Sequence, residues 1–131
     1  MISTRPLVLL IEDFDDAREM YAEYLQFTGL SVATAPDAVQ GLKLAAELRP
    51  AVILMDAGLP GLSGWDAIAE LKRNAATREI PVLMLTGHAL GDARERALAA
   101  GAHGFIAKPC LPDDLARQIH TVLEQELRPD R

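Results

Sequence analysis

Five short apolar runs recur along the chain, at residues 7–11, 30–35, 51–55, 81–85 and 104–107. Within each run the apolar residues are nearly continuous rather than alternating, and the run at 30–35 is the weakest of the five. Continuous apolar runs of this length are typical of strands buried on both faces, as in parallel sheets. The pattern therefore predicts five buried strands.

The segments between these runs have the apolar spacing of helices with one buried face. Each carries a residue type that is common at a helix end: capping side chains, a glycine after the last turn, or a proline in the first turn. The spacing of Asp37 and Gln40 resembles a capping box, and this helix is expected to run to about Leu48. The residues expected to begin or end the helices are Gly29, Asp37, Ser63, Gly101 and Pro112.

Strand and helix thus alternate five times, which predicts an α/β fold with a parallel sheet and right-handed crossovers. Five such units fit a doubly wound (βα)5 sandwich, and the flavodoxin-like strand order 2-1-3-4-5 is the leading candidate. A closed eight-stranded barrel would need about twice this length. We expect residues 1–131 to form a single domain with its core at about residues 6–127.

Composition agrees with one domain, since 131 residues with half of them apolar can bury a core. The net charge of −6 disfavours a general nucleic-acid or anionic-membrane binder, because both need a basic face. The single cysteine, Cys110, excludes an intrachain disulfide and a Cys-rich zinc site. No apolar run approaches the ~18 residues of a membrane span. These features predict a soluble, cytoplasmic domain.

Residues able to handle a phosphoryl group or a metal ion stand at the carboxyl ends of the predicted strands. The first strand ends in Glu12 and Asp13, the third ends in Asp56, the fourth in Thr86 and the fifth in Lys108. Open α/β sheets bind ligands beyond these ends, at the switch point, which for this order lies between strands 1 and 3. Three carboxylates are therefore expected at the ligand position.

Clustered carboxylates repel one another unless a cation joins them, and a site made only of oxygens favours Mg²⁺ or Mn²⁺. A carboxylate can also attack phosphorus and form an aspartyl phosphate. Phosphoryl transfer then needs positive charge and hydrogen-bond donors around the phosphoryl oxygens, which a metal ion, Lys108 and Thr86 would supply. Asp15 and Asp16 are interpreted instead as the start of a helix.

With these residues in place, the sequence resembles the receiver (CheY-like) domain of two-component response regulators. The resemblance covers nearly the whole chain, and the ordered set of motifs is specific although each motif alone is weak. The motifs lie at residues 8–13 with Asp15 and Asp16, 53–56, 59–64, 84–87, 101–102 and 104–109.

The resemblance implies a role for each matching residue at the strand ends. Asp56 would be the phosphorylated aspartate. Asp13 would bind Mg²⁺ directly, Glu12 would do so directly or through water, and the backbone carbonyl of Gly58 would be a further ligand beside Asp56. Lys108 would pair with the phosphoryl group.

The resemblance also implies how a signal would leave the site. Thr86 and Phe105 would be the coupled switch residues, and the Lys108–Pro109 peptide bond would be cis. The fourth helix, fifth strand and fifth helix, at about residues 90–127, would form the output surface. A sensor histidine kinase or a histidine phosphotransfer protein would donate the phosphoryl group, and a downstream protein would bind the output surface.

On this interpretation the chain is a switch rather than an enzyme, because it catalyses only its own phosphorylation and dephosphorylation. It is expected to have no output domain and no direct contact with nucleic acid. It would act as a monomer or as a phosphorylation-dependent homodimer.

Three other functions stay open at this point. A phosphatase of the haloacid-dehalogenase type would use Asp13 as its nucleophile, but the chain is short, Ala17 stands where that family has Thr or Val, and Asp56 is left unexplained. An interaction module on the same scaffold would work without phosphorylation. A flavin-binding protein is weaker still, because no phosphate-cradling loop follows the first strand.

Overall fold

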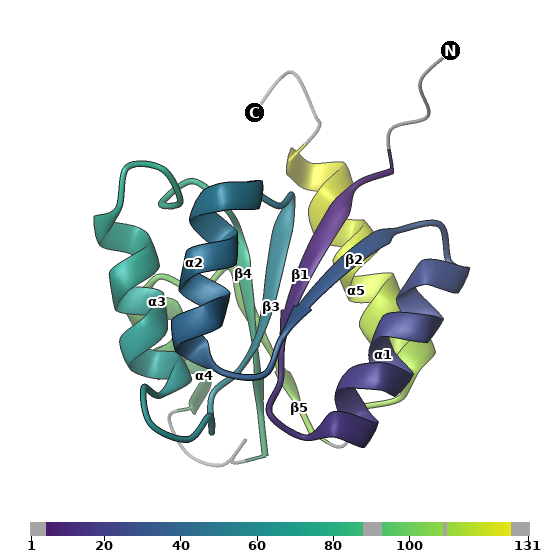
Figure 1. The fold of residues 1–131 in the computed structure, drawn as a ribbon, viewed down its shortest axis with the longest axis horizontal. Helices are drawn as coiled ribbons and strands as arrows, with labels where there is room; N and C mark the ends of the chain where they lie inside the picture. Colours follow the sequence, from purple (N-terminus) through teal and green to yellow (C-terminus); the bar gives the residue numbers. More distant parts are fainter. Residues whose placement is uncertain (1–4, 88–92, 109, 127–131) are drawn as a thin grey trace.

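The computed structural model describes residues 5–87, 93–108 and 110–126, and the chain alternates strand and helix throughout them (Figure 1). The strands are β1 (Leu7–Ile11), β2 (Ser31–Ala35), β3 (Val52–Asp56), β4 (Val82–Thr86) and β5 (Gly104–Ala107). The helices are α1 (Asp15–Phe27), α2 (Ala38–Leu48), α3 (Gly64–Arg73), α4 (Ala93–Ala100) and α5 (Pro112–Glu126).

The five strands form one parallel sheet in the order β2-β1-β3-β4-β5, which confirms the predicted topology. Helices α1 and α5 cover one face of the sheet, and α2, α3 and α4 cover the other (Figure 1). The order reverses at β1, so the two strands beside the predicted switch point, β1 and β3, are neighbours in the sheet. The fold therefore places the ends of β1 and β3 next to each other.

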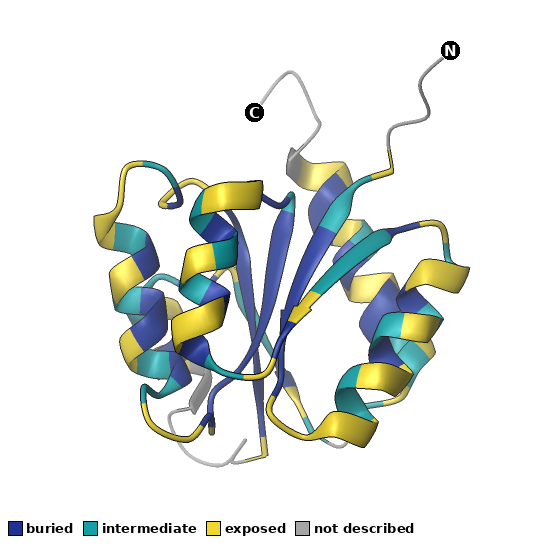
Figure 2. Ribbon diagram, in the orientation of Figure 1, coloured by how far each residue is buried: buried dark blue, intermediate teal, exposed yellow. Residues whose placement is uncertain are grey.

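Two apolar cores, one on each face, explain the continuous apolar runs. Successive strand side chains point to opposite faces. Leu9 and Ile53 accordingly belong to the core under α2 and α3, whereas Leu10 and Leu54 belong to the core under α1 and α5. In Figure 2 the central strands are buried along their length, and the helices are exposed only on their outer sides. Within the described residues, no helix is long and apolar enough to cross a membrane.

The helix ends follow the predicted signals, with one difference. Ser63 Oγ accepts a hydrogen bond from the Asp66 N–H at 3.1 Å, and Gly29 and Gly101 follow their helices with φ of 100° and 109°. Asp37 caps α2 by accepting from the Gln40 N–H at 2.8 Å. The Gln40 side-chain amide, however, donates to the Asp37 carboxylate itself at 3.2 Å. The reciprocal bond to the Asp37 backbone that defines a capping box is thus replaced by a second bond to the same cap.

Candidate functional site

Backbone hydrogen bonds bring the carboxyl ends of the strands into register at one edge of the sheet. The Glu12 N–H donates to the Ala35 carbonyl at 3.1 Å, and the Ala57 N–H donates to the Leu85 carbonyl at 2.7 Å. These bonds extend the pairing one residue beyond β1 and β3, so they fix the positions of Glu12 and of the residue that follows Asp56. The end of the sheet therefore fixes the backbone from which the side chains of the site project.

Three carboxylates meet at this end of the sheet, as the sequence predicted. One oxygen from each of Glu12, Asp13 and Asp56 lies within 4.8 Å of the others. Glu12 and Asp56 are buried, with 1% and 8% of their surface exposed, whereas Asp13 is exposed. Oxygen ligands this close together, with one side open to solvent, fit a hard divalent cation such as Mg²⁺, which retains several of its waters. The residues present can therefore hold the metal ion that the sequence implied.

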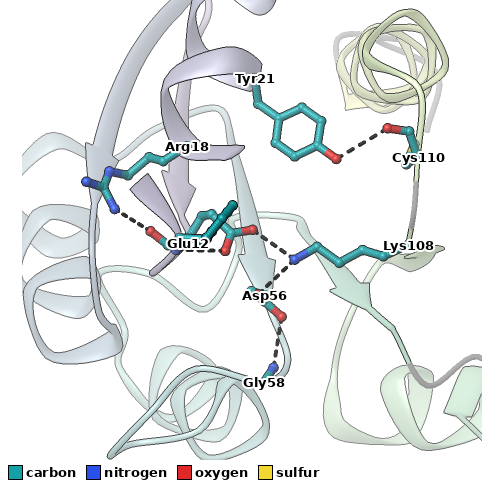
Figure 3. A network of polar contacts seen from close by, with 8 residues as sticks. Glu12, Arg18, Tyr21, Asp56, Gly58, Lys108 and Cys110 are labelled. Carbon is teal, nitrogen blue, oxygen red and sulfur yellow. Dashed lines mark hydrogen bonds and ion pairs between the residues drawn. The ribbon is translucent and has the colours of Figure 1, made fainter. Parts of the chain in front are cut away.

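Lys108 joins two of these carboxylates across the sheet. From the end of β5, its Nζ donates to Glu12 Oε1 and to Asp56 Oδ2, each at 3.0 Å (Figure 3). The Lys108 N–H also donates to the Thr86 carbonyl at 2.8 Å, which fixes the backbone from which the side chain reaches inward. The sequence predicted Lys108 beside a phosphoryl group, but it held no signal for the contact with Glu12, 96 residues away.

Asp56 is oriented at both of its oxygens. Oδ2 accepts from Lys108, and Oδ1 accepts from the Gly58 N–H at 2.9 Å (Figure 3). A buried carboxylate held in this way has a defined direction in which it can meet a phosphorus atom. The Gly58 N–H is thus at the site, while the Gly58 carbonyl as a metal ligand stays a prediction.

The predicted switch residues lie on the two strands beyond Asp56. Thr86 ends β4 and is buried, with 4% of its surface exposed. Phe105 pairs with Met84 in the sheet and is half-buried against the core under α2, α3 and α4. Pro109, whose peptide bond was predicted to be cis, lies outside the described residues, as do parts of the predicted output surface.

Two side chains of α1 that the sequence did not single out support the site. The Arg18 guanidinium donates to the Glu12 carbonyl at 2.8 Å, and the Tyr21 hydroxyl donates to the Cys110 carbonyl at 3.3 Å (Figure 3). These bonds hold the two loops that carry Glu12 and Lys108 against the same helix. Neither contact could be read from spacing, because each acceptor is a backbone carbonyl.

Burial dominates the electrostatics of Glu12. Loss of water raises the pKa of the Glu12 carboxyl, the bonds from Lys108 and the Phe14 N–H lower it, and the nearby Asp56 charge raises it again, so that the pKa is above its usual range. For Lys108, burial lowers the pKa, but the hydrogen bonds to Asp56 and Glu12 outweigh burial, and the net pKa is raised. Lys108 is therefore stably protonated, whereas burial disfavours the ionised form of the Glu12 carboxyl.

Glu12→Gln should change how stability depends on pH in protein freed of metal ions by a chelator. Because the pKa of Glu12 is higher in the folded chain than its ordinary 4.5, the folded state binds the proton more tightly. The free energy of unfolding of the wild type should therefore fall, relative to that of Glu12→Gln, as pH rises from 4.5 through the folded pKa. Urea unfolding at a series of pH values measures this difference. If the free energies of unfolding of the two proteins depended on pH in the same way, this would contradict a raised pKa for Glu12 in the folded chain.

Comparison with known proteins decides the family. The sequence matches the response regulator receiver domain over residues 8–120. The chain belongs to this family. The resemblance seen in the sequence is thereby confirmed, and the fold is the one that receiver domains share.

Curated relatives agree with this assignment. The chain is 38% identical over 118 residues to the phosphate regulon transcriptional regulatory protein PhoB of Klebsiella pneumoniae, and 31% identical over 122 residues to the transcriptional regulatory protein PrrA of Mycobacterium tuberculosis. These alignments cover 90% and 93% of the chain but 52% of each relative. The receiver domain described here thus spans about half the length of the curated relatives it matches.

Solved structures show the same fold. The chemotaxis protein CheY4 of Vibrio cholerae superposes with a TM-score of 0.86 at 28% identity, covering 91% of this chain and 99% of that one. The receiver domain of the Francisella response regulator 1452 superposes with a TM-score of 0.87, covering 93% and 99%. Its identity of 20% makes that likeness one of fold alone.

Proposed function

We propose that this receiver domain is a phosphoacceptor switch of a two-component phosphorelay, with Asp56 as the phosphorylated residue. The observation that carries the proposal is the setting of Asp56. Its carboxylate is buried, an ammonium group lies 3.0 Å from Oδ2, and two further carboxylates lie within metal-binding distance. A nucleophile, a fixed cation and a cation-binding site are the parts that phosphoryl transfer to a carboxylate needs.

Each described side chain has a definite part in the proposed transfer. An oxygen of Asp56 attacks the phosphorus of a phosphohistidine or of acetyl phosphate, and the bond from phosphorus to the donor nitrogen or oxygen breaks. Lys108 and the Thr86 hydroxyl stabilise the negative charge on the phosphoryl oxygens. A divalent cation held by Glu12, Asp13 and Asp56, with the Gly58 carbonyl as a proposed further ligand, would add positive charge at those oxygens when bound.

Mg²⁺ should stabilise the folded chain, and Asp13→Asn should remove most of that effect. An ion that binds only the folded state adds about 2.7 kcal/mol to the free energy of unfolding at 100 times its dissociation constant. Asp13 is the exposed member of the cluster, so its loss should weaken the site with little harm to the core. Thermal unfolding with and without Mg²⁺ measures this.

Asp16→Asn is the control, since it also removes an exposed carboxylate near the site, one that belongs to the first turn of α1. An equal Mg²⁺ effect in the wild type and in Asp13→Asn would contradict the proposed metal site. In the same samples, uptake of a phosphoryl group from acetyl phosphate should require Mg²⁺ and should fail in a chelator.

The proposed signal passes from Asp56 to the surface formed by α4, β5 and α5. Once Asp56 carries a phosphoryl group, Lys108 binds that group, and Thr86 and Phe105 adjust to it. A groove of about 360 Å³ lies on this surface, and its lining includes Phe105, Leu98 and Arg117. A movement of Phe105 would therefore reshape the surface that a downstream protein binds.

The proposal extends to partners and location. A sensor histidine kinase or a histidine phosphotransfer protein donates the phosphoryl group in the cytoplasm, and the receiver domain turns over no external metabolite. The curated relatives are named as transcriptional regulators, and because the chain spans about half of their length, that activity is not carried over to this chain. The downstream partner is a protein that binds the surface of α4, β5 and α5, with the chain as a monomer or as a homodimer formed on phosphorylation.

A further inference from the structure

Gly64, the first residue of α3, touches the backbone of the phosphorylation site with no room for a side chain. A Cβ at this position would lie 2.4 Å from the Asp56 carbonyl oxygen, 2.8 Å from the Ala57 Cα and 3.1 Å from the Asp56 carbonyl carbon. All three are backbone atoms, which cannot rotate away as the end of a side chain can. A methyl group at residue 64 would therefore have to displace either α3 or the peptide that joins Asp56 to Ala57.

The segment that contains that peptide is held between α3 and β4. On one side the Gly64 N–H donates to the Ala57 carbonyl at 3.2 Å, and on the other the Ala57 N–H donates to the Leu85 carbonyl at 2.7 Å. The Gly58 N–H, one residue further along, donates to Asp56 Oδ1. A shift of this segment would thus move the Asp56 carboxylate and its donor together, relative to Lys108 on β5.

We propose that Gly64 is a positioning residue for phosphoryl transfer. Because Gly64 has no side chain, the start of α3 can pack directly against the backbone of the segment that carries Asp56. This contact sets the distances from the Asp56 carboxylate to Lys108 and to the metal-binding carboxylates. The inference rests on the proposed function, because it concerns how the same site is aligned.

Gly41, on the neighbouring helix over the same core, offers a matched control. A Cβ at Gly41, on α2, would lie 2.4 Å from Ile11 Cδ1 and 2.8 Å from Ile11 Cγ1. The steric conflict is as close as the one at Gly64, but its three nearest atoms, which include Ile11 Cγ2 at 3.3 Å, all belong to one side chain rather than to the backbone. Gly41→Ala should therefore disturb the packing and the stability of the domain without moving Asp56.

The experiment compares the wild type, Gly64→Ala and Gly41→Ala by the rate of acyl phosphate formation from acetyl phosphate, the Mg²⁺ dissociation constant from calorimetry, and thermal unfolding. Both variants should unfold at a lower temperature than the wild type. Gly64→Ala alone should also lose about 10- to 100-fold in the rate of phosphorylation, since a misplacement of ~1 Å can cost that much. It should bind Mg²⁺ more weakly as well.

The outcomes separate this inference from the proposed function. A folded Gly64→Ala that matches Gly41→Ala in both rate and Mg²⁺ affinity would overturn the positioning role. A wild type that gains no phosphoryl group would overturn the proposed function, and the Mg²⁺ affinities of the variants would still test the alignment of the carboxylates. If Gly64→Ala does not fold, all three proteins are compared in a stabilising osmolyte. A variant that stays unfolded there assigns Gly64 to folding alone and overturns the inference.

Discussion

Asp56→Asn should take up no phosphoryl group from acetyl phosphate, although the domain stays folded. The side-chain amide has nearly the shape of the carboxylate and can still accept a hydrogen bond from Lys108 or from the Gly58 N–H. It lacks the negative oxygen that attacks phosphorus, so the covalent step is lost entirely rather than slowed. Intact-protein mass spectrometry after incubation with acetyl phosphate and Mg²⁺ measures the uptake, and circular dichroism measures the fold.

Asp66→Asn is the matched control for this experiment, because it removes an exposed carboxylate from the nearby α3. It should be phosphorylated at the wild-type rate. Phosphoryl uptake by Asp56→Asn would show that another residue is the acceptor. A cellular signal that Asp56→Asn transmits as well as the wild type would instead favour an interaction module that works without phosphorylation.

Lys108→Met should slow phosphorylation by about 100- to 1000-fold at saturating Mg²⁺, the usual cost of losing one preorganised charge-stabilising group. Methionine keeps much of the apolar stem of lysine and removes the ammonium group. In the wild type that ammonium lies 3.0 Å from both Glu12 and Asp56, so it competes with a metal ion for the same carboxylates. Removing it should therefore leave Mg²⁺ binding intact or tighter at pH 8, although phosphoryl transfer is slow.

Lys43→Met, which removes an exposed lysine from α2, is the control. It should change neither the rate of phosphorylation nor the affinity for Mg²⁺. The informative result is that Lys108→Met slows phosphoryl transfer without weakening Mg²⁺ binding. A variant that loses Mg²⁺ affinity and transfer rate together would mean that Lys108 holds the site in shape rather than stabilising the transferred group.

The architecture could be predicted from the sequence because the apolar runs are short and continuous and the helix ends are marked. Strand β1 lies where the pattern put it, at Leu7–Ile11. Strands β3 and β4 end at Asp56 and Thr86, as predicted, but each begins one residue later than its apolar run, at Val52 and Val82. Pro81 has no N–H to donate to the ladder, whereas pairing of Asp56 with Leu85 continues the sheet through a charged residue.

The proximity of the residues at the strand ends could also be predicted, because topology alone brings Glu12, Asp13 and Asp56 to one edge of a parallel sheet. What could not be predicted is how these groups contact one another. The bridge from Lys108 to Glu12 depends on the length and direction of two side chains that follow strands that do not pair, β5 and β1. The role of Gly64 depends on how closely a helix approaches a backbone, and a glycine in a sequence does not reveal that distance.

The location of the phosphoryl group after incubation with acetyl phosphate and Mg²⁺ tests the central claim most directly. The aspartyl phosphate is reduced with borohydride, which marks the modified residue, and peptide mass spectrometry then finds it. The proposed function predicts that the label is on Asp56, that it requires Mg²⁺, and that phosphomonoesters are not turned over. A label on Asp13, or rapid hydrolysis of a phosphomonoester, would contradict it and would restore the phosphatase hypothesis.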